Sequence, residues 1–458
     1  MGVSKEFEAK RHITRTPVPQ ALPLLAADAP SRVVAWRGGE PVRADVFLAH
    51  VRQVRDCLPP GGFTVNLCED RYDFLVAFCA IVLAGQVNLL PPSRAPQPVA
   101  EIMAAHPGCH AVGEKAPDLS PPHYVRMPTL HAVLEDVFEV PSIPGAQTAV
   151  IGYTSGSTGH PQPNGKTWAS LHASNAGNMR ILRQAIGGDF HLVATVPPQH
   201  MYGLEMSVLL PLLGGIGVHA GRPFFAADIA DALAEVPAPR VLVTTPVHLR
   251  ALLADQVTLP DLAAVVSATA PMPVELAQAA EQRFDAPVLE VFGSTETCVF
   301  ASRRTTSEPL WTLYPGAHLH PQPDGTRVEA PQLDAPVTLA DLVELPDARH
   351  FRLCGRNTDL LEIAGKRASL GDLNRRLLSI PGVEDGVMFQ ADDGHGERVR
   401  RIAALVVAPT LGEAELMAQL REMIDPAFLP RPLRRVASLP RNETGKLPRQ
   451  ALLDLLKA

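Results

Sequence analysis

The stretch Tyr153-Thr-Ser-Gly-Ser-Thr-Gly-His-Pro161 combines two glycines with four serine and threonine side chains. The apolar run Thr148-Ala-Val-Ile-Gly152 precedes it and is typical of a buried strand. A loose cluster of glycine and serine would suit a polar surface turn. In this order after a strand, however, backbone N–H groups and hydroxyls can converge on one anionic group. The stretch therefore predicts a phosphate-binding loop.

A Walker A loop is an alternative, because Gly159 lies near Gly165-Lys166-Thr167. That motif needs four residues between its glycines, whereas five residues, His160 to Asn164, stand here. Two of these five are prolines, which remove amide donors. The Walker A interpretation is therefore disfavoured.

The order Tyr-Thr-Ser-Gly-Ser-Thr-Gly-x-Pro resembles the phosphate loop of the adenylate-forming superfamily, which includes acyl-CoA synthetases, aryl-acid ligases, luciferases and peptide-synthetase adenylation domains. The resemblance implies that the loop binds ATP through Thr154, Ser155, Gly156, Ser157, Thr158 and Gly159. The superfamily has Lys after the loop proline, whereas Gln162 stands here. Either Lys166 supplies that charge instead, or the contact is lost.

Composition favours small-molecule chemistry. The chain has 458 residues, enough for two or three domains, and a formal net charge of −7 with a pI near 6.1. This balance gives no basic field for nucleic acid or anionic lipid. The six cysteines form no CxxC pair and predict neither a zinc site nor disulfides.

The segment 1–10 lacks the apolar core of a signal peptide, and the longest apolar run, 74–84, is too short to span a bilayer. We therefore expect a reduced, cytoplasmic enzyme with no membrane span and no nucleic-acid partner.

Apolar periodicity predicts alternating strands and helices. A hairpin is expected over 32–40, and an α/β fold of helix-covered sheets follows from the alternation. The expected helices are 44–58, 70–84, 205–213, 226–234 and 274–284, and the expected strands are 86–90, 190–196, 240–245, 262–267, 288–292, 383–389 and 402–407.

The segment Pro197-Pro-Gln-His-Met-Tyr-Gly-Leu204 joins an expected strand to an apolar helix. A lone histidine is usually structural, but this one lies at a strand end, where open α/β sheets bind ligands. The segment resembles the superfamily's acyl-pocket motif, which implies that His200 borders the activated carboxylate. Met201, Tyr202 and Gly203 would then shape the pocket. Peptide-synthetase domains usually have Asp at the position of Met201 to pair with an α-ammonium, so the substrate should lack that group.

The segment Val291-Phe-Gly-Ser-Thr-Glu296 resembles the superfamily pattern Tyr-Gly-x-Thr-Glu. The resemblance implies that Thr295 touches the α-phosphate, that Glu296 holds Mg²⁺ and that Phe292, followed by Gly293, stacks on adenine. The alternative is that Glu296 is a solvated loop acid. The turn Ser267-Ala-Thr-Ala-Pro271 resembles the segment whose backbone approaches adenine, which places Ala268 there.

Asp341 precedes Gly355-Arg356 by a spacing similar to that between the superfamily's ribose-binding Asp and its Gly-Arg hinge motif. Asp341 and Arg356 are therefore candidate nucleotide-binding residues. The usual Thr-Gly before the Asp is missing, which leaves Asp347 as an alternative.

The lid region carries the remaining motifs. Asp359 occupies the superfamily's hinge position, and Ser369-Leu-Gly-Asp372 reads as a capping box. Leu-Pro-Arg-Asn-Glu-Thr-Gly-Lys446 matches the catalytic lysine motif, although a terminal lysine is usually just a solvated charge. The resemblance implies a large N-terminal adenylation domain over 1–355 and a small mobile α+β lid over 356–458.

These motifs are similar to those of enzymes that activate a carboxylic acid with MgATP and pass the acyl group to a phosphopantetheine thiol. The short chain resembles compact AMP ligases of aryl-polyene pathways, which implies a small aryl acid loaded on an acyl carrier protein. A fatty-acyl or aryl-CoA ligase that uses free CoA is the close alternative. A nucleotide-binding regulatory module without catalysis is a third, and Gln162 is its only support. The sequence leaves the oligomeric state open.

Overall fold

The computed structural model describes residues 20–115, 121, 123–133, 137–155, 161–323, 325–356, 360–363, 366–391, 401–442, 445 and 447–457. Within these ranges only the backbone is described at 154, 155, 161, 356, 360, 362, 363, 366–369, 372 and 401.

The first sheet has six strands in the order β10-β9-β5-β4-β6-β7. All neighbours in it are parallel except the hairpin of β9 and β10 at its edge. Its strands are β4 (Phe63–Asn66), β5 (Val87–Leu90), β6 (His110–Gly113), β7 (Tyr124–Arg126), β9 (Thr148–Ser155) and β10 (Pro161–Thr167).

The second sheet has eleven strands in the order β21-β22-β17-β16-β15-β14-β13-β11-β12-β2-β3. Its middle, from β2 to β15, is parallel, and the flanking strands are antiparallel. The strands are β2 (Val33–Arg37), β3 (Glu40–Arg43), β11 (His191–Ala194), β12 (Gly217–His219), β13 (Arg240–Thr244), β14 (Ala264–Ser267), β15 (Val288–Ser294), β16 (Cys298–Arg304), β17 (Trp311–Leu313), β21 (Asp341–Glu344) and β22 (His350–Arg356).

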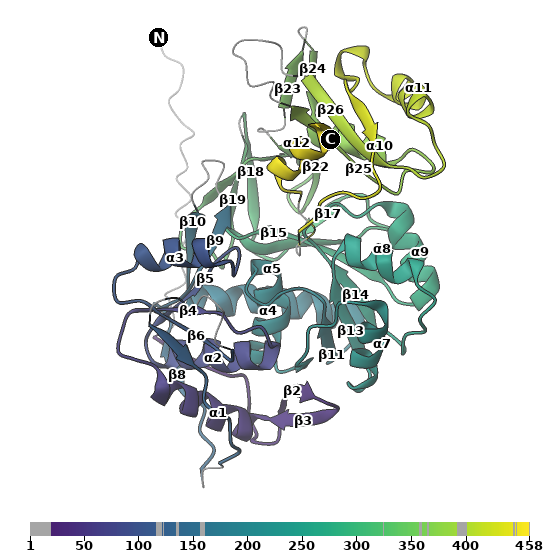
Figure 1. Ribbon diagram of the computed structural model, residues 1–458. Coiled ribbons are helices and arrows are strands. Elements are labelled where there is room, and N and C mark those ends of the chain that lie inside the picture. Colours follow the sequence, from purple (N-terminus) through teal and green to yellow (C-terminus); the bar gives the residue numbers. More distant parts are fainter. Residues whose placement is uncertain are drawn as a thin grey trace, which may run out of the picture.

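Helices pack on these sheets (Figure 1). They are α1 (Ala44–Cys57), α2 (Arg71–Leu83), α3 (Pro96–Ala104), α4 (Trp168–Ile186), α5 (Met201–Leu204), the π-helix η1 (Glu205–Leu209), α6 (Leu210–Leu213), α7 (Ala226–Ala234), α8 (Pro246–Ala254) and α9 (Val274–Phe284).

Helix α2 illustrates why the sequence folds this way. The Asp70 side chain accepts hydrogen bonds from the N–H groups of Tyr72 and Asp73, which caps the helix start. Its apolar run has no polar face, so α2 is buried against α1 and against β4, β5 and β6. The main core cluster spans residues of both large sheets and of the helices between them.

Four small sheets complete the described structure, two before residue 357 and two in the lid. They contain β1 (Ala21–Pro23) with β8 (Ser142–Pro144), then β18 (His318–Gln322), β19 (Gly325–Glu329) and β20 (Val337–Leu339), and in the lid β25 (Asp385–Ala391), β26 (Arg401–Val407) and β27 (Leu433–Arg435). The lid also has the hairpin β23 (Leu360–Ile363) and β24 (Lys366–Ser369), with α10 (Leu370–Leu378), α11 (Glu413–Met423), the 3₁₀ turn η3 (Pro426–Phe428) and α12 (Arg449–Lys457).

The lid elements lie together at one end of the molecule, beyond β17, where α10 and β24 contact β22 (Figure 1). Two core clusters consist only of residues from 361 onward. The molecule therefore has a large α/β part and a small α+β part, as the sequence predicts. Helix α10 begins at Leu370, next to the predicted capping residue Ser369, whose side chain is not described.

Most expected elements are present, including the hairpin of β2 and β3, whose turn glycines Gly38 and Gly39 have φ values of 58° and 77°. Two of the differences lie beside the candidate site. Strand β10 was not expected, because Pro161 and Pro163 disfavour a strand interior, but β10 is the edge strand of its sheet. The expected helix 205–213 begins four residues earlier, at Met201, and contains a π-helical turn.

Within the described ranges no helix is both long and apolar enough to cross a membrane. All six cysteines are free thiols.

Candidate active site

Gly152 marks the place where three sequence motifs meet. A Cβ atom on this buried glycine would lie 3.1 Å from Thr295 Cγ2 and 3.5 Å from Met201 Cε. Gly152 lies in β9 directly before the phosphate loop, Thr295 follows β15, and Met201 begins α5. The fold thus brings the loop strand, the acyl-pocket segment and the Gly-Ser-Thr-Glu turn into contact.

Sheet topology explains this meeting. Strands β11, β13, β14 and β15 are parallel neighbours, so their carboxyl ends share one edge. The acyl-pocket segment follows β11, the turn with Ala268 follows β14, and the turn with Thr295 follows β15. Ligands of open α/β sheets bind at such an edge.

The acyl-pocket segment is held tightly. A Cβ atom on Gly203 would lie 1.9 Å from the Pro197 carbonyl oxygen, so only glycine fits there. The half-buried His200 is the residue before α5, and its carbonyl accepts the Leu204 N–H.

The Tyr202 hydroxyl donates to Thr244 O at 3.1 Å and to Val266 O at 3.0 Å, at the ends of β13 and β14. Burial raises the pKa of Tyr202, which keeps its hydroxyl protonated as a donor.

The turn between β15 and β16 is shaped by its own hydroxyls. Thr297 Oγ1 accepts the Ser294 N–H at 3.1 Å, and Ser294 Oγ accepts the Thr297 N–H at 3.3 Å. A Cβ atom on Gly293 would meet Cys298 O at 2.2 Å, and Cys298 itself has a φ of 58°. This close, left-handed geometry leaves Thr295 and Glu296 partly exposed on the turn.

Phe292 is partly exposed on β15 and packs into an aromatic cluster. Its ring centroid lies 5.3 Å from that of Trp311, 5.4 Å from Phe300 and 5.8 Å from Phe351. In the turn after β14, Ala268 precedes Thr269, whose φ of 78° is rare for a β-branched residue. Such backbone strain is concentrated at functional sites.

Lys166 is buried on β10, with 6% of its surface exposed, and its Nζ donates to the carbonyl oxygen of Glu296. The sequence leaves open whether Lys166 replaces the missing loop lysine. In the structure the Lys166 side chain reaches the backbone of Glu296, the candidate Mg²⁺ ligand. Gln162, which stands at the lysine position, is exposed and pairs with Thr154 across the hairpin.

Asp341 and Arg356 are direct partners in the register of β21 and β22, so the two nucleotide-binding candidates lie side by side. Asp347 lies in the turn between these strands, at their opposite end, and accepts bonds from the N–H groups of Arg349 and His350. These bonds lower the pKa of Asp347. The geometry favours Asp341 over its alternative.

Several candidates cannot be placed. Gly156, Ser157, Thr158, Gly159, Asp359 and Lys446 lie outside the described residues, and the side chains of Thr154, Ser155 and Arg356 are not described.

The neighbour of Lys446 can be located. A Cβ atom on Gly445 would lie 3.4 Å from Val247 Cγ2 in α8, and α8 directly follows β13. Arg441 Nη1 donates to the Gly445 carbonyl at 2.7 Å, and Arg441 forms a bidentate ion pair with Asp385 of β25. Gly445 of the lid therefore lies beside the helix that follows β13, and the last carbonyl of β13 accepts the Tyr202 hydroxyl.

Sequence reasoning missed Glu205, which is 1% exposed and starts the π-helix. Its carboxylate accepts from Ser174 Oγ at 2.5 Å, from Asn178 Nδ2 at 3.3 Å and from the Val299 N–H at 3.0 Å. A charged residue in an otherwise apolar helix, directly after the acyl-pocket motif, was the available signal. A π-helical turn is itself frequent at functional sites.

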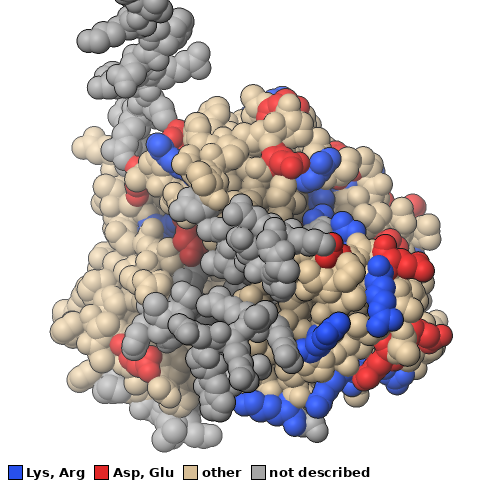
Figure 2. Space-filling model, turned by 90° about the horizontal axis from the view of Figure 1, so that it is seen from above, with Lys and Arg blue, Asp and Glu red and all other residues tan. Residues whose placement is uncertain are grey.

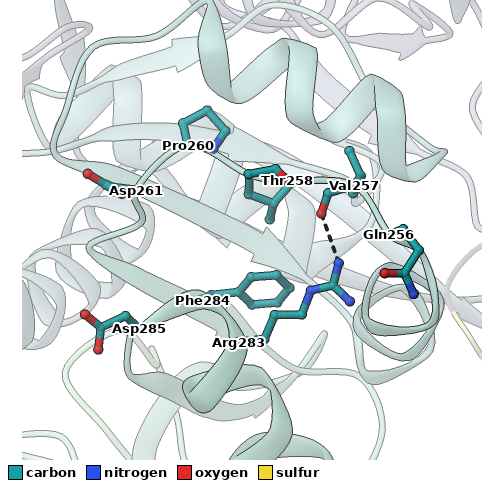
Figure 3. Close-up of a pocket in the computed structure, with 9 residues that line it drawn as sticks. Gln256, Val257, Thr258, Pro260, Asp261, Arg283, Phe284 and Asp285 are labelled. Atoms are coloured by element: carbon teal, nitrogen blue, oxygen red, sulfur yellow. Dashed lines mark hydrogen bonds between the residues drawn. The ribbon is translucent and has the colours of Figure 1, made fainter.

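A crevice of about 300 Å³ lies elsewhere, between the segment 256–261 and the end of α9 (Figure 3). Arg283 crosses it and donates to Leu253 O at 2.8 Å and Val257 O at 2.9 Å. Because these bonds hold its guanidinium against the backbone and no motif residue lines the crevice, it is unrelated to the candidate site.

Figure 2 shows acidic and basic side chains interspersed on the face seen from above.

The residues suit a metal ion that arrives with a nucleotide. Among the described residues, no group of three or more His, Cys, Asp or Glu side chains could hold a metal. Mg²⁺ commonly uses one or two carboxylates together with substrate phosphates. The single carboxylate of Glu296, on a partly exposed turn, fits that mode.

Comparison with known proteins identifies the family of the chain. A family model described as AMP-binding enzyme matches residues 67–329, more than half of the chain. The 4-coumarate–CoA ligase of Halorhodospira halophila is 32% identical over 304 residues, which cover 64% of this chain and 73% of that protein. The 2-succinylbenzoate–CoA ligase of Bacillus velezensis is 24% identical over 347 residues, covering 68% of this chain and 69% of that protein.

Solved structures share the fold. O-succinylbenzoate coenzyme A synthetase (MenE) from Bacillus subtilis, in complex with AMP, has a TM-score of 0.78 at 17% identity and covers 94% of this chain and 98% of its own. ATP-bound MatB from Rhodopseudomonas palustris has a TM-score of 0.75 at 19% identity, covering 94% and 97%. Taken with the family model and the meeting of the three motifs at Gly152, these matches lead to one conclusion: the chain belongs to the AMP-binding enzyme family and is an AMP-forming acid–thiol ligase.

Proposed function

We propose that this ligase activates a small aryl acid and transfers it to a phosphopantetheine thiol, carried by an acyl carrier protein or by CoA. The closeness of Thr295 and Met201 to the position that a Cβ atom on Gly152 would take carries the proposal. Because a Cβ atom on Gly152 would meet both side chains, this closeness supports a site where the strand before the phosphate loop, the candidate α-phosphate contact and the candidate acyl pocket adjoin. An acid and a nucleotide bound there would be adjacent.

In the first step, a carboxylate oxygen of the acid attacks the α-phosphorus of ATP. The bond from phosphorus to the bridging oxygen of pyrophosphate breaks, and an acyl-adenylate and pyrophosphate result. Both reactants are anionic, so fixed positive charge and hydrogen-bond donors must offset their repulsion. Donors of the phosphate loop, the Thr295 hydroxyl and Lys446 would supply these, and Glu296 would hold the Mg²⁺ that accompanies ATP.

In the second step, the thiol sulfur attacks the acyl carbon of the adenylate. The bond from that carbon to the AMP oxygen breaks, the thiol proton leaves to solvent, and a thioester and AMP result. We infer that the lid turns about Asp359 between the steps and that the domain boundary lies near 356–360. Strands up to β22 belong to the large part, and every strand after Leu360 pairs within the lid, which supports that boundary.

The acid is assigned on two grounds. Met201 is apolar and offers no charge partner for an α-ammonium, so amino acids are disfavoured. Relatives at 24% to 32% identity are named for 4-coumarate and 2-succinylbenzoate, both of which contain an aromatic ring. The resemblance to AMP ligases of aryl-polyene pathways favours a carrier-protein acceptor, and the same relatives, named as CoA ligases, favour free CoA.

Acid-dependent exchange of labelled pyrophosphate into ATP tests the first step with a panel of benzoates, cinnamates, fatty acids and amino acids. Exchange should be strongest with an aryl acid. Glu296→Gln should abolish it, while Glu308→Gln, an exposed glutamate on the segment after β16, should not. Preference for a fatty acid would overturn the aryl assignment. ATP binding without exchange for any acid would favour the regulatory module.

A further inference from the structure

Three buried side chains from separate elements converge on the turn between β15 and β16. They are Lys166 of β10, Glu205 of η1 and Gln332 of the segment before β20, and they are 6%, 1% and 6% exposed. None of the three carries a role in the reaction described above. All three act on the backbone directly beside Thr295 and Glu296.

Each contact fixes a different backbone group. Lys166 Nζ donates to the Glu296 carbonyl. Gln332 Nε2 donates to Thr297 O at 3.1 Å and to Val299 O at 3.2 Å. Both oxygens of the Glu205 carboxylate accept the Val299 N–H, at 3.0 and 3.1 Å. The backbone from 296 to 299 is therefore held from the protein interior.

Glu205 is anchored in turn by Ser174 and Asn178 of α4. Burial raises the pKa of its carboxyl group, whereas the hydrogen bonds from Ser174, Val299 and Asn178 and the positive charge of Lys166 act in the opposite direction. A buried carboxylate and a buried ammonium are each costly alone and are tolerated when their charges oppose one another. Lys166 and Glu205 thus stabilise each other's burial as well as the turn.

The hairpin register limits what Lys166 can reach. Lys166 pairs with Val150 near the base of the hairpin, whereas Pro161 pairs with Ser155 at the end nearest the phosphate loop. Five residues of strand at about 3.4 Å each separate Lys166 from Pro161 by about 17 Å. A lysine directed into the interior from that position does not extend to Ser155 and Pro161, the hairpin residues that flank the loop in the sequence.

We propose that Lys166, Glu205 and Gln332 are positioning residues that fix the turn carrying Thr295 and Glu296, and that Lys166 acts through the Glu296 carbonyl without touching a phosphate. The inference rests on the proposed function, because it assigns Glu296 to the Mg²⁺ that accompanies ATP. The proposal gives Lys166 a purpose in a chain that has Gln162 at the usual lysine position. Lys166 orders the turn and does not bind a phosphate.

Equilibrium binding of ATP separates positioning from direct contact. Affinity is measured by calorimetry on the full-length protein, once with ATP and excess Mg²⁺ and once with ATP in EDTA. The variants are Lys166→Met, Glu205→Gln and Gln332→Met. Glu290→Gln is the matched control, because Glu290 is also a buried carboxylate on this hairpin, 2% exposed, and bonds to Arg303 and Thr305 at the other end of it.

If the three side chains position the turn, each variant should lose about tenfold in affinity for MgATP and less than twofold for metal-free ATP, because only the former uses Glu296. Glu290→Gln should keep both affinities. Equal losses with and without Mg²⁺ in Lys166→Met would show direct phosphate contact and overturn the proposal. Unchanged MgATP affinity in all three folded variants would also overturn it.

Two further readouts keep the outcome unambiguous. Thermal unfolding identifies a variant that fails to fold, and Gln332→Met, which removes no charge, then tests the same turn. The affinity of the Lys166→Met/Glu205→Gln double variant for MgATP should be within twofold of that of the weaker-binding single variant. The two effects should not add, because both side chains act on the turn between β15 and β16. If wild type binds MgATP more tightly than metal-free ATP yet shows no exchange with any acid, the proposed function fails while the positioning role is still tested.

Discussion

Gly152→Ala is the most direct test of the site, because the structure gives the size of the perturbation. The added Cβ would lie 3.1 Å from Thr295 Cγ2, so the threonine must retreat by a few tenths of an ångström, and it would lie 3.5 Å from Met201 Cε, an ordinary contact. Overpacking of this kind costs about 1 to 3 kcal/mol when the neighbours cannot move. A displacement of 1 Å at reacting groups can cost about 10²-fold in rate, so a shift of a few tenths should cost about tenfold.

Acid-dependent pyrophosphate exchange measures this effect, with kcat and the KM for the acid determined separately. We expect kcat to fall about tenfold and the unfolding temperature to fall by a few degrees. Gly165→Ala is the control on the same hairpin, because its Cβ would lie 3.9 Å from Thr148 Cγ2. If the two alanine variants were equally active and equally folded, Thr295 would not lie at the reacting centre, and the site assignment would be wrong.

Three other predictions follow from the same geometry. Free α-amino acids should give no exchange, since Met201 cannot pair with a buried ammonium and that burial costs several kcal/mol; exchange comparable to that of benzoates would contradict this. Lys446→Ala should lose about 10² to 10³ in exchange rate yet still convert a synthetic acyl-adenylate to thioester, because the lysine serves only the first step. Arg431→Glu/Arg434→Glu should slow transfer to an acidic carrier protein in a salt-dependent way and leave adenylation unchanged, since both arginines are exposed on the lid.

Controls sharpen the last two predictions. For the carrier, Arg421→Glu/Lys457→Glu changes the lid by the same charge at two other exposed positions and should not slow transfer. Efficient transfer to free CoA with none to any carrier would reject the carrier assignment. For Lys446, a folded variant in which both half-reactions fell together would contradict a role confined to adenylation.

The sequence predicted the fold well because its elements follow local patterns. Helices α7 and α9 begin and end at the expected residues, since their apolar periodicity is undisturbed. Strand β10 was missed because its prolines disfavour a strand, and only its place at the edge of the sheet makes them acceptable.

The site was predicted in part. His200, Thr295 and Glu296 belong to linear motifs, and linear motifs are visible in a sequence. Glu205 contacts Val299, which lies 94 residues away, and Lys166 contacts Glu296, which lies 130 residues away. No local pattern encodes such proximity. Residue type alone also left Asp341 and Asp347 undecided, until strand register placed Asp341 opposite Arg356.

The short link after strand β22 limits how the lid can move relative to the large part. Strand β22 pairs with β17 on one side and with β21 on the other, and its pairing with β21 extends to Arg356. The lid strand β23 starts at Leu360, so a chain of four residue steps, at most about 14 Å when extended, joins the two parts. A tether this short forbids the lid from sliding across the active site as a separate body. If the lid turns as proposed, it must swivel about a pivot next to β22, and the nucleotide site would stay in place while the proposed catalytic lysine moves away.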